Sequence, residues 1–78
     1  MLDENVLSIL NDIAEAIKEA GLDPYEQLYG YATTGNELYI TRHRGARERI
    51  RAVDVADIVI FVKLLEQMNI RHNNKHPG

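Results

Sequence analysis

Five arginines within ten residues are the side chains in this sequence best suited to bind a ligand. Guanidinium groups hold phosphate through paired hydrogen bonds, so the cluster could bind nucleic acid or a phosphorylated protein partner. On a helix, three of them would share one face, and the other two would point elsewhere. The three are Arg44, Arg47 and Arg51, and the two are Arg42 and Arg49. The structural interpretation is favoured, in which the arginines line a solvated helix face and pair with acids of the same chain or its dimer mate.

Four tyrosines precede the arginines and offer a second kind of surface. On a helix, Tyr25 and Tyr29 share a face, whereas Tyr31 points another way. Aromatic rings can stack on nucleic-acid bases, but packing with the hydroxyl at the rim of a partly wet interface is the favoured interpretation. We therefore predict a packing or dimer surface that comprises Tyr25, Tyr29, Tyr31, Gly30, Phe61 and Leu64.

The three histidines do not form a convincing catalytic or metal site. His72 and His76 are four residues apart, which suits a metal on a helix, but they lie in RHNNKHPG, a segment without helical character or a third ligand. His43 lies between two arginines and is interpreted as structural. No Ser–His–Asp arrangement stands out, and the TTGN loop lacks the lysine of a phosphate-binding loop. We predict no enzyme activity, no metal and no cofactor.

The charge is unevenly distributed along the chain. Residues 1–37 carry eight acids against one lysine, whereas residues 38–51 carry five arginines against one glutamate. The net charge is −3, which opposes tight non-specific binding to DNA even though the basic segment could contact nucleic acid. The chain therefore has an acidic front, residues 1–37, and one compact basic segment.

Length and composition predict a single small domain. The chain has 78 residues, 45% of them hydrophobic, and no cysteine that could provide a disulfide or a thiolate ligand. So short a chain has a thin core, which favours tight helix packing or self-association. The sequence contains no signal-peptide pattern and no apolar run long enough to cross a membrane. We expect a cytoplasmic protein with no membrane contact.

Two long helices are predicted before the arginine segment. Apolar residues at four- and three-residue spacing indicate a helix over residues 4–20, capped by Asp3 and ended by Gly21. Asp23-Pro24 with Glu26 predicts a capping box at the start of a second helix that stops before Gly35. Gly30 lies inside this helix, and we expect another helix to approach closely there.

The remaining chain is predicted to form two more helices. Thr41 is the expected cap of a short helix over residues 42–51, and Asp54 begins a last, strongly apolar helix. The run from Ile58 to Val62 could also be a buried strand, but the apolar segment exceeds ten residues and begins with a cap, so helix is preferred. A DNA-reading helix-turn-helix would expose basic and polar residues on its second helix, whereas residues 55–65 are almost wholly apolar. The last helix is therefore predicted to be a core element. We expect one helical domain over 1–68 and a polar tail over 69–78.

The order of residues through the middle of the chain resembles the IreB-type regulatory phosphoproteins of Gram-positive bacteria. The resemblance extends over residues 6–65. It is carried by Gly21, Pro24, Gln27, Gly30-Tyr31, Gly35, Tyr39-Ile40, Arg42, Ala46-Arg47, Ile50-Arg51 and Asp57-Ile58. The resemblance implies a small all-helical homodimer without catalytic activity. It further implies a role downstream of a transmembrane Ser/Thr kinase and its phosphatase, in cell-wall stress responses and cephalosporin resistance.

This chain departs from the family pattern in two places. The family's phosphorylated threonines precede the first helix, but residues 1–7, MLDENVL, contain neither serine nor threonine. No phosphorylation site is carried over, because Thr33, Thr34 and Thr41 do not occupy the family's positions. The family's Asp-Pro after the central glycine is Asn36-Glu37 here.

Together these observations predict an all-α compact bundle of about four helices. We expect a homodimer through the last helix and the tyrosine-bearing segment, because so apolar a helix needs more cover than one short chain offers. The predicted function is a non-enzymatic regulatory or adaptor protein with an unidentified protein partner. The alternative is a nucleic-acid-binding regulator that uses the five arginines between Arg42 and Arg51.

Overall fold

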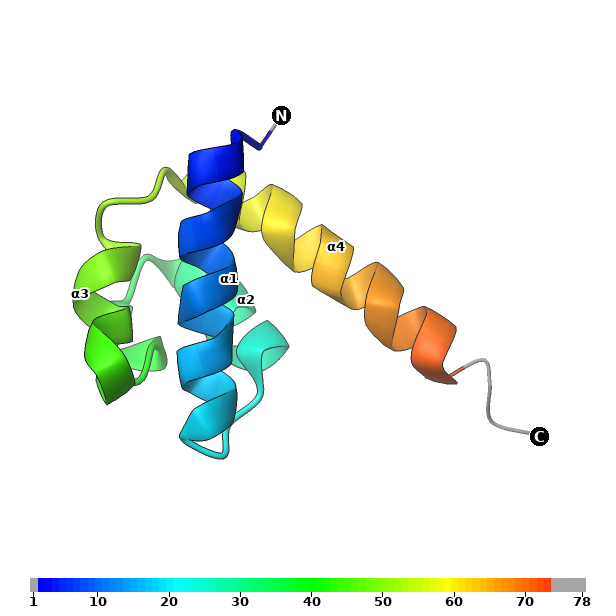
Figure 1. The fold of residues 1–78 in the computed structure, drawn as a ribbon, viewed down its shortest axis with the longest axis horizontal. Helices are drawn as coiled ribbons and strands as arrows, with labels where there is room; N and C mark the ends of the chain where they lie inside the picture. Colours follow the sequence, from blue (N-terminus) through cyan, green and yellow to red (C-terminus); the bar gives the residue numbers. More distant parts are fainter. Residues whose placement is uncertain (1, 74–78) are drawn as a thin grey trace.

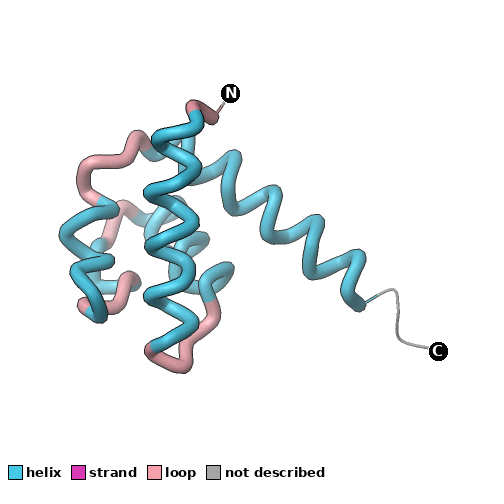
Figure 2. The backbone as a smooth tube through the Cα atoms, in the orientation of Figure 1, coloured by secondary structure: helices cyan, strands magenta, loops and turns pink. Residues whose placement is uncertain are grey.

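The computed structural model describes residues 2–73 of the chain, and these residues form helices and connecting turns without any strand (Figure 2). The predicted all-α class and the four helices are therefore confirmed. The helices are α1 (Glu4–Glu19), α2 (Pro24–Thr34), α3 (Ala46–Ile50) and α4 (Val55–Asn73), with the 3₁₀ turns η1 (Glu37–Tyr39) and η2 (His43–Gly45) between α2 and α3.

The helices surround one core, and α4 projects from it. Figure 1 shows α3 and α4 on opposite sides of α1, with the C-terminal half of α4 extending away from the body. Helix α2 packs mainly against α4, whereas α1 packs against α3 and α2. The longest dimension is 40 Å and the shortest 22 Å. Within the described part of α4, Ile58 and Phe61 are buried in the core, whereas Leu64 and Met68 further along the helix are exposed.

Every helix contributes apolar side chains to the core. Burying one large aliphatic side chain stabilises a fold by about 1.5–3 kcal/mol relative to leaving it exposed. In α1 the buried positions follow the predicted four- and three-residue spacing, so that interpretation is confirmed. The fully buried large side chains are Leu10, Ile13, Ile17, Leu28, Ile40, Ile50 and Ile58.

Aspartates cap three of the helices, as the sequence predicts. The Oδ1 atom of Asp3 accepts a hydrogen bond from the backbone N–H of residue 5 at 2.8 Å, and that of Asp23 accepts from residue 25 at 3.0 Å. Asp54 likewise accepts from the N–H of residue 56 at 3.0 Å. Each bond satisfies a backbone donor that the first helical turn leaves without a partner.

The predicted helix over residues 42–51 is wrong in its first half. Arg44 has φ 54° and Gly45 has φ 72°, so two successive residues adopt the left-handed conformation and interrupt a helix. The α-helical part begins only at Ala46. Thr41 accepts a hydrogen bond from the N–H of His43 at 3.2 Å, and α3 begins after Gly45 without a side-chain cap, so Thr41 is not the cap of α3. The arginine side chains consequently do not follow one helical face.

Gly30 permits a close approach, but the group that approaches is an aromatic ring and not a helix. A Cβ at this position would lie 2.7 and 2.8 Å from Cε1 and Cγ of Tyr39, which is closer than real side chains come. Tyr39 ends η1, and its ring lies over the glycine of α2. The expectation of a packing reason is confirmed, and the expected partner is corrected.

The last apolar segment forms a helix, so the strand alternative for Ile58 to Val62 is wrong. The helix also continues to Asn73, beyond the expected end near Met68. The rest of the predicted tail, residues 74–78, lies outside the described residues, and His76 lies with it. No side-chain position is described for His72.

Candidate partner-binding site

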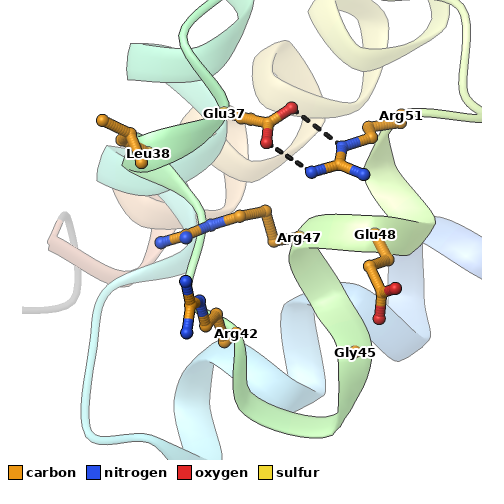
Figure 3. Close-up of a pocket in the computed structure, with 7 residues that line it drawn as sticks. All are labelled: Glu37, Leu38, Arg42, Gly45, Arg47, Glu48 and Arg51. Carbon is orange, nitrogen blue, oxygen red and sulfur yellow. Dashed lines mark hydrogen bonds and ion pairs between the residues drawn. The ribbon is translucent and has the colours of Figure 1, made fainter.

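An open pocket lies between η1, η2 and α3, and three of the five candidate arginines line it (Figure 3). Its volume is about 570 Å³. One wall of the pocket comes from η1, and the other comes from the segment between residues 42 and 51. The lining residues are Glu37, Leu38, Arg42, Gly45, Arg47, Glu48 and Arg51.

Three of the five arginines form ion pairs with carboxylates of the acidic front. Arg44 Nη1 lies 3.0 Å from a carboxylate oxygen of Glu19, and Arg49 Nη2 lies 3.2 Å from one of Asp12. The third pair joins Arg51 and Glu37. The predicted pairing with acids of the same chain is therefore found at these three positions. Each of these guanidinium groups would have to give up its carboxylate to bind a phosphate, so the geometry does not favour a five-arginine nucleic-acid surface.

The other two arginines, Arg42 and Arg47, direct their guanidinium groups toward the same side of the pocket (Figure 3). Arg47 donates from Nε to the backbone carbonyl of Ile40 at 2.8 Å, which fixes the side chain. Arg42 is exposed, and within the described residues neither side chain forms an ion pair. The predicted helical face of Arg44, Arg47 and Arg51 is thus corrected, because Arg42 replaces Arg44 beside the other two.

Glu37 and Arg51 form the fixed side of the pocket. Arg51 donates from Nε to Oε2 of Glu37 at 2.8 Å and from Nη2 to Oε1, so the pair is bidentate. The hydrogen bond from Arg51 lowers the pKa of Glu37, and burial partly opposes it. The same hydrogen bond raises the pKa of Arg51. Both groups therefore stay charged at neutral pH and face each other across the two elements.

Leu38 is a pocket residue that sequence reasoning did not assign to a site. Leu38, Tyr39 and Ile40 form a short apolar run, and the first two of them lie in the turn η1. Only Ile40 is buried, however, whereas Leu38 is 69% exposed at the pocket. Nothing in the local sequence distinguishes Leu38 from a buried leucine, because its exposure at the pocket depends on how η1 packs against the rest of the chain.

The predicted tyrosine surface divides between core and exterior. The rings of Tyr25 and Tyr29 stack with centroids 5.7 Å apart, and the hydroxyl of Tyr25 donates to Glu66 of α4 at a long 3.4 Å. Desolvation raises the pKa of Tyr25, and the Glu66 carboxylate raises it further. Gly30 and Phe61 are buried, and Tyr31 is half-buried against the core. Those three residues therefore pack inside the protomer.

Exposed apolar side chains on α4 form the second surface. Leu64 is 43% exposed and Met68 is 63% exposed, on the helix that projects from the body (Figure 1). On the other side of α4, Val59 is 38% and Tyr29 of α2 is 50% exposed. Apolar hollows of about 260 and 160 Å³ flank the helix on these two sides. We call the exposed residues Tyr29, Val59, Leu64 and Met68 the α4 surface.

His43 makes a contact consistent with the structural role expected of it. Its Nε2 lies 3.1 Å from Oε1 of Glu19, the carboxylate that also binds Arg44, so one acid joins η2 to the end of α1. In the described part of the chain, no three histidine or acidic side chains are grouped as a metal site would need. Nor does any helix there have the length and apolar character to cross a membrane.

In a comparison with protein families, the family model described as IreB regulatory phosphoprotein matches residues 2–67. This chain belongs to the IreB family. The match confirms the resemblance seen in the sequence and extends it toward both ends. The IreB-family description assigns a regulatory role, and the arginine-lined pocket and most of the α4 surface lie within the matched residues.

The residues that carry the IreB resemblance have identifiable structural roles here. Gly21 and Gly35 have φ of 80° and 74° where α1 and α2 end, conformations that glycine adopts without strain. Gly30 accommodates the ring of Tyr39. Arg47 and Arg51 tie α3 to the segment around η1 through Ile40 and Glu37. In this chain the residues of the resemblance therefore set the helix ends and hold α3 beside η1, although the contact of Arg51 is to Glu37, where the chain departs from the family pattern.

Proposed function

We propose that this IreB-family protein is a non-enzymatic adaptor that acts in the cytoplasm, as a homodimer, in a pathway governed by a Ser/Thr kinase. The observation that carries the proposal is the family match over residues 2–67. The kinase pathway and its link to cell-wall stress come from what the family implies. Among the described residues, the arginine-lined pocket and the α4 surface are two places where the protomer offers side chains to another molecule.

The α4 surface supports the homodimer. Leu64 and Met68 lie on one exposed side of α4, and a second apolar surface that covers this side would stabilise the helix. A second copy of the chain presents the same apolar side chains, and a two-fold axis would bring them together. Sedimentation or light scattering at micromolar concentration is expected to give twice the monomer mass. A monomer mass with a melting temperature independent of concentration contradicts the dimer.

The adaptor role is tested by affinity capture from the native cell. The tagged full chain is expected to retain a protein partner, and intact-mass analysis of the recovered bait reports any phosphate. Of the hydroxyls present, Thr33 and Thr34 donate to backbone carbonyls of α2 at 2.9 and 2.6 Å, and Thr41 accepts from the N–H of His43. If capture returns no protein above a tag-only control, the adaptor role is wrong. Turnover of a substrate by the purified chain contradicts the non-enzymatic role.

A further inference from the structure

The pocket side with Arg42 and Arg47 carries positive charge that no ion pair of the described residues neutralises, although the charge of Arg47 helps to lower the pKa of Glu37. The guanidinium groups of Arg42 and Arg47 are turned toward the same side (Figure 3), and no carboxylate of that part of the chain forms an ion pair with either. Two like charges brought together repel, and an anion between them removes that repulsion. The other three arginines of the segment, by contrast, each form an ion pair with a carboxylate of the same chain.

One of the two arginines is held in place before any ligand binds. The Nε atom of Arg47 donates to the carbonyl of Ile40 at 2.8 Å, which leaves the terminal nitrogens of the guanidinium for a further acceptor. Ile40 is fully buried, so its carbonyl is a fixed anchor. A donor that is already oriented loses less entropy on binding. Arg42 is exposed and adds the second, movable group.

Phosphate monoesters match this pair of arginines in charge and geometry. A phosphorylated side chain carries a charge of about −1.5 to −2 at neutral pH and three strong acceptor oxygens. Two guanidinium groups supply a charge of +2 and several N–H donors in planar forks. A carboxylate offers one negative charge and fewer acceptor sites. The pocket, at about 570 Å³, has room for a phosphate together with the residue that carries it.

The rest of the pocket lining selects a protein segment over a nucleic acid. Glu37 and Glu48 also line the pocket, so a polyanion with a charge on every nucleotide would meet carboxylates beside the arginines. Leu38, which is 69% exposed, offers an apolar contact to a neighbouring side chain. We propose that Arg42 and Arg47 bind a phosphorylated side chain of a protein partner, while Leu38 contacts an apolar residue next to it.

This assignment rests on the proposed adaptor function, because it names the chemical class of the partner. The two claims use different surfaces and are measured separately. Peptide binding at the pocket needs Arg42 and Arg47, whereas dimer formation needs the α4 surface. Absence of a dimer with normal phosphopeptide binding contradicts only the dimer. Normal partner capture without phosphopeptide binding contradicts only the pocket assignment.

The experiment is an NMR titration that observes the arginine Nε–Hε signals of the full chain. The probes are degenerate peptide pools with a central phosphoserine, phosphothreonine or phosphotyrosine, the same pools without phosphate, and inorganic phosphate. At least one phosphorylated pool is expected to shift the signals of Arg42 and Arg47 and to leave that of Arg49 unchanged. The unphosphorylated pools are expected to shift none. Equal shifts from both kinds of pool, or no shift from any, overturn the proposal.

Matched variants separate a built site from general electrostatic attraction. Arg42→Ala removes an exposed side chain without an ion pair in the described structure and is expected to weaken phosphopeptide binding about tenfold with the fold intact. Arg49→Ala removes the same charge from a pair with Asp12 and is expected to change affinity less than twofold. Leu38→Ala is expected to weaken binding of the peptide pool but not of inorganic phosphate. Equal losses in Arg42→Ala and Arg49→Ala contradict the site.

Nucleic acid provides the remaining comparison. A single-stranded DNA oligonucleotide is expected to bind more weakly than the best phosphorylated pool at physiological salt. Tighter binding of the oligonucleotide, with a steep dependence on salt and similar losses for Arg42→Ala and Arg49→Ala, would assign the surface to nucleic acid and overturn the proposal.

Discussion

Arg51 and Glu37 are joined by two parallel hydrogen bonds, although one residue follows α3 and the other begins η1. The Nε–Oε2 distance is 2.8 Å, and Nη2 donates to Oε1 of the same carboxylate. With the bond from Arg47 to the carbonyl of Ile40, this pair ties the segment after α2 to α3. The pocket exists because these contacts hold its two walls in place.

Acid is expected to weaken this tie. Arg51 lowers the pKa of Glu37 below its ordinary value of 4.5, so the carboxylate stabilises the folded state above pH 4.5. That contribution is lost as the pH falls through the folded-state pKa. Glu37→Gln should lower the free energy of unfolding near neutral pH and flatten its decline below pH 4.5. Urea unfolding between neutral pH and about pH 3 measures both effects.

The matched control for the acid prediction is Glu15→Gln. Glu15 pairs with Lys18 at 3.9 Å, and both side chains are more than 60% exposed, so little stability is expected from that contact. An unchanged acid slope in Glu37→Gln, or an equal change in the control, would contradict the role assigned to Glu37.

Gly30→Ala is expected to have opposite effects in two backgrounds. In the natural chain the new Cβ meets the ring of Tyr39, and such overpacking costs about 1–3 kcal/mol. In a Tyr39→Ala background the ring is gone, and the better helix propensity of alanine should stabilise α2 by about 1 kcal/mol. Thermal or urea unfolding of the natural chain, the two single variants and the double variant measures the coupling. The same change in both backgrounds would show that the ring does not exclude a side chain there.

Asp23→Ala is expected to destabilise the protein by about 1 kcal/mol, because the N–H of Tyr25 loses its acceptor at the start of α2. Asp23→Asn keeps an acceptor oxygen at the same position and should cost much less. Urea unfolding of both variants provides the measurement. An asparagine variant as unstable as the alanine variant would show that charge, and not the cap, is what matters.

Leu64→Glu is expected to convert the proposed dimer into a monomer. The side chain is 43% exposed in the protomer, so glutamate can be accommodated without disturbing the core, but it would bring charge into an apolar interface. Sedimentation across a range of concentrations gives the dissociation constant. Gln67→Glu adds the same charge to an exposed polar position of the same helix and should leave the dimer intact. Equal dissociation of both variants would point to a general charge effect.

The sequence predicts local features well where the decisive atoms are close along the chain. Asp3, Asp23 and Asp54 accept hydrogen bonds from backbone groups only two residues away, so their capping roles can be read from the sequence. The left-handed conformation at Arg44 is the main failure, because non-glycine residues rarely adopt it and tertiary contacts hold it. This backbone conformation places the Arg44 side chain beside Glu19, away from the expected helical face.

What the sequence by itself determined is the all-helical class, the starts of α1, α2 and α4, and the family. These follow from apolar periodicity, short-range caps and the order of glycines and arginines. Only the tertiary structure decided which arginines are free to bind, because their acceptors lie far along the chain. Arg44, Arg49 and Arg51 find carboxylates 25, 37 and 14 residues away. Spacing along a helix cannot report such distances, since they depend on how α1, η1 and α3 pack together.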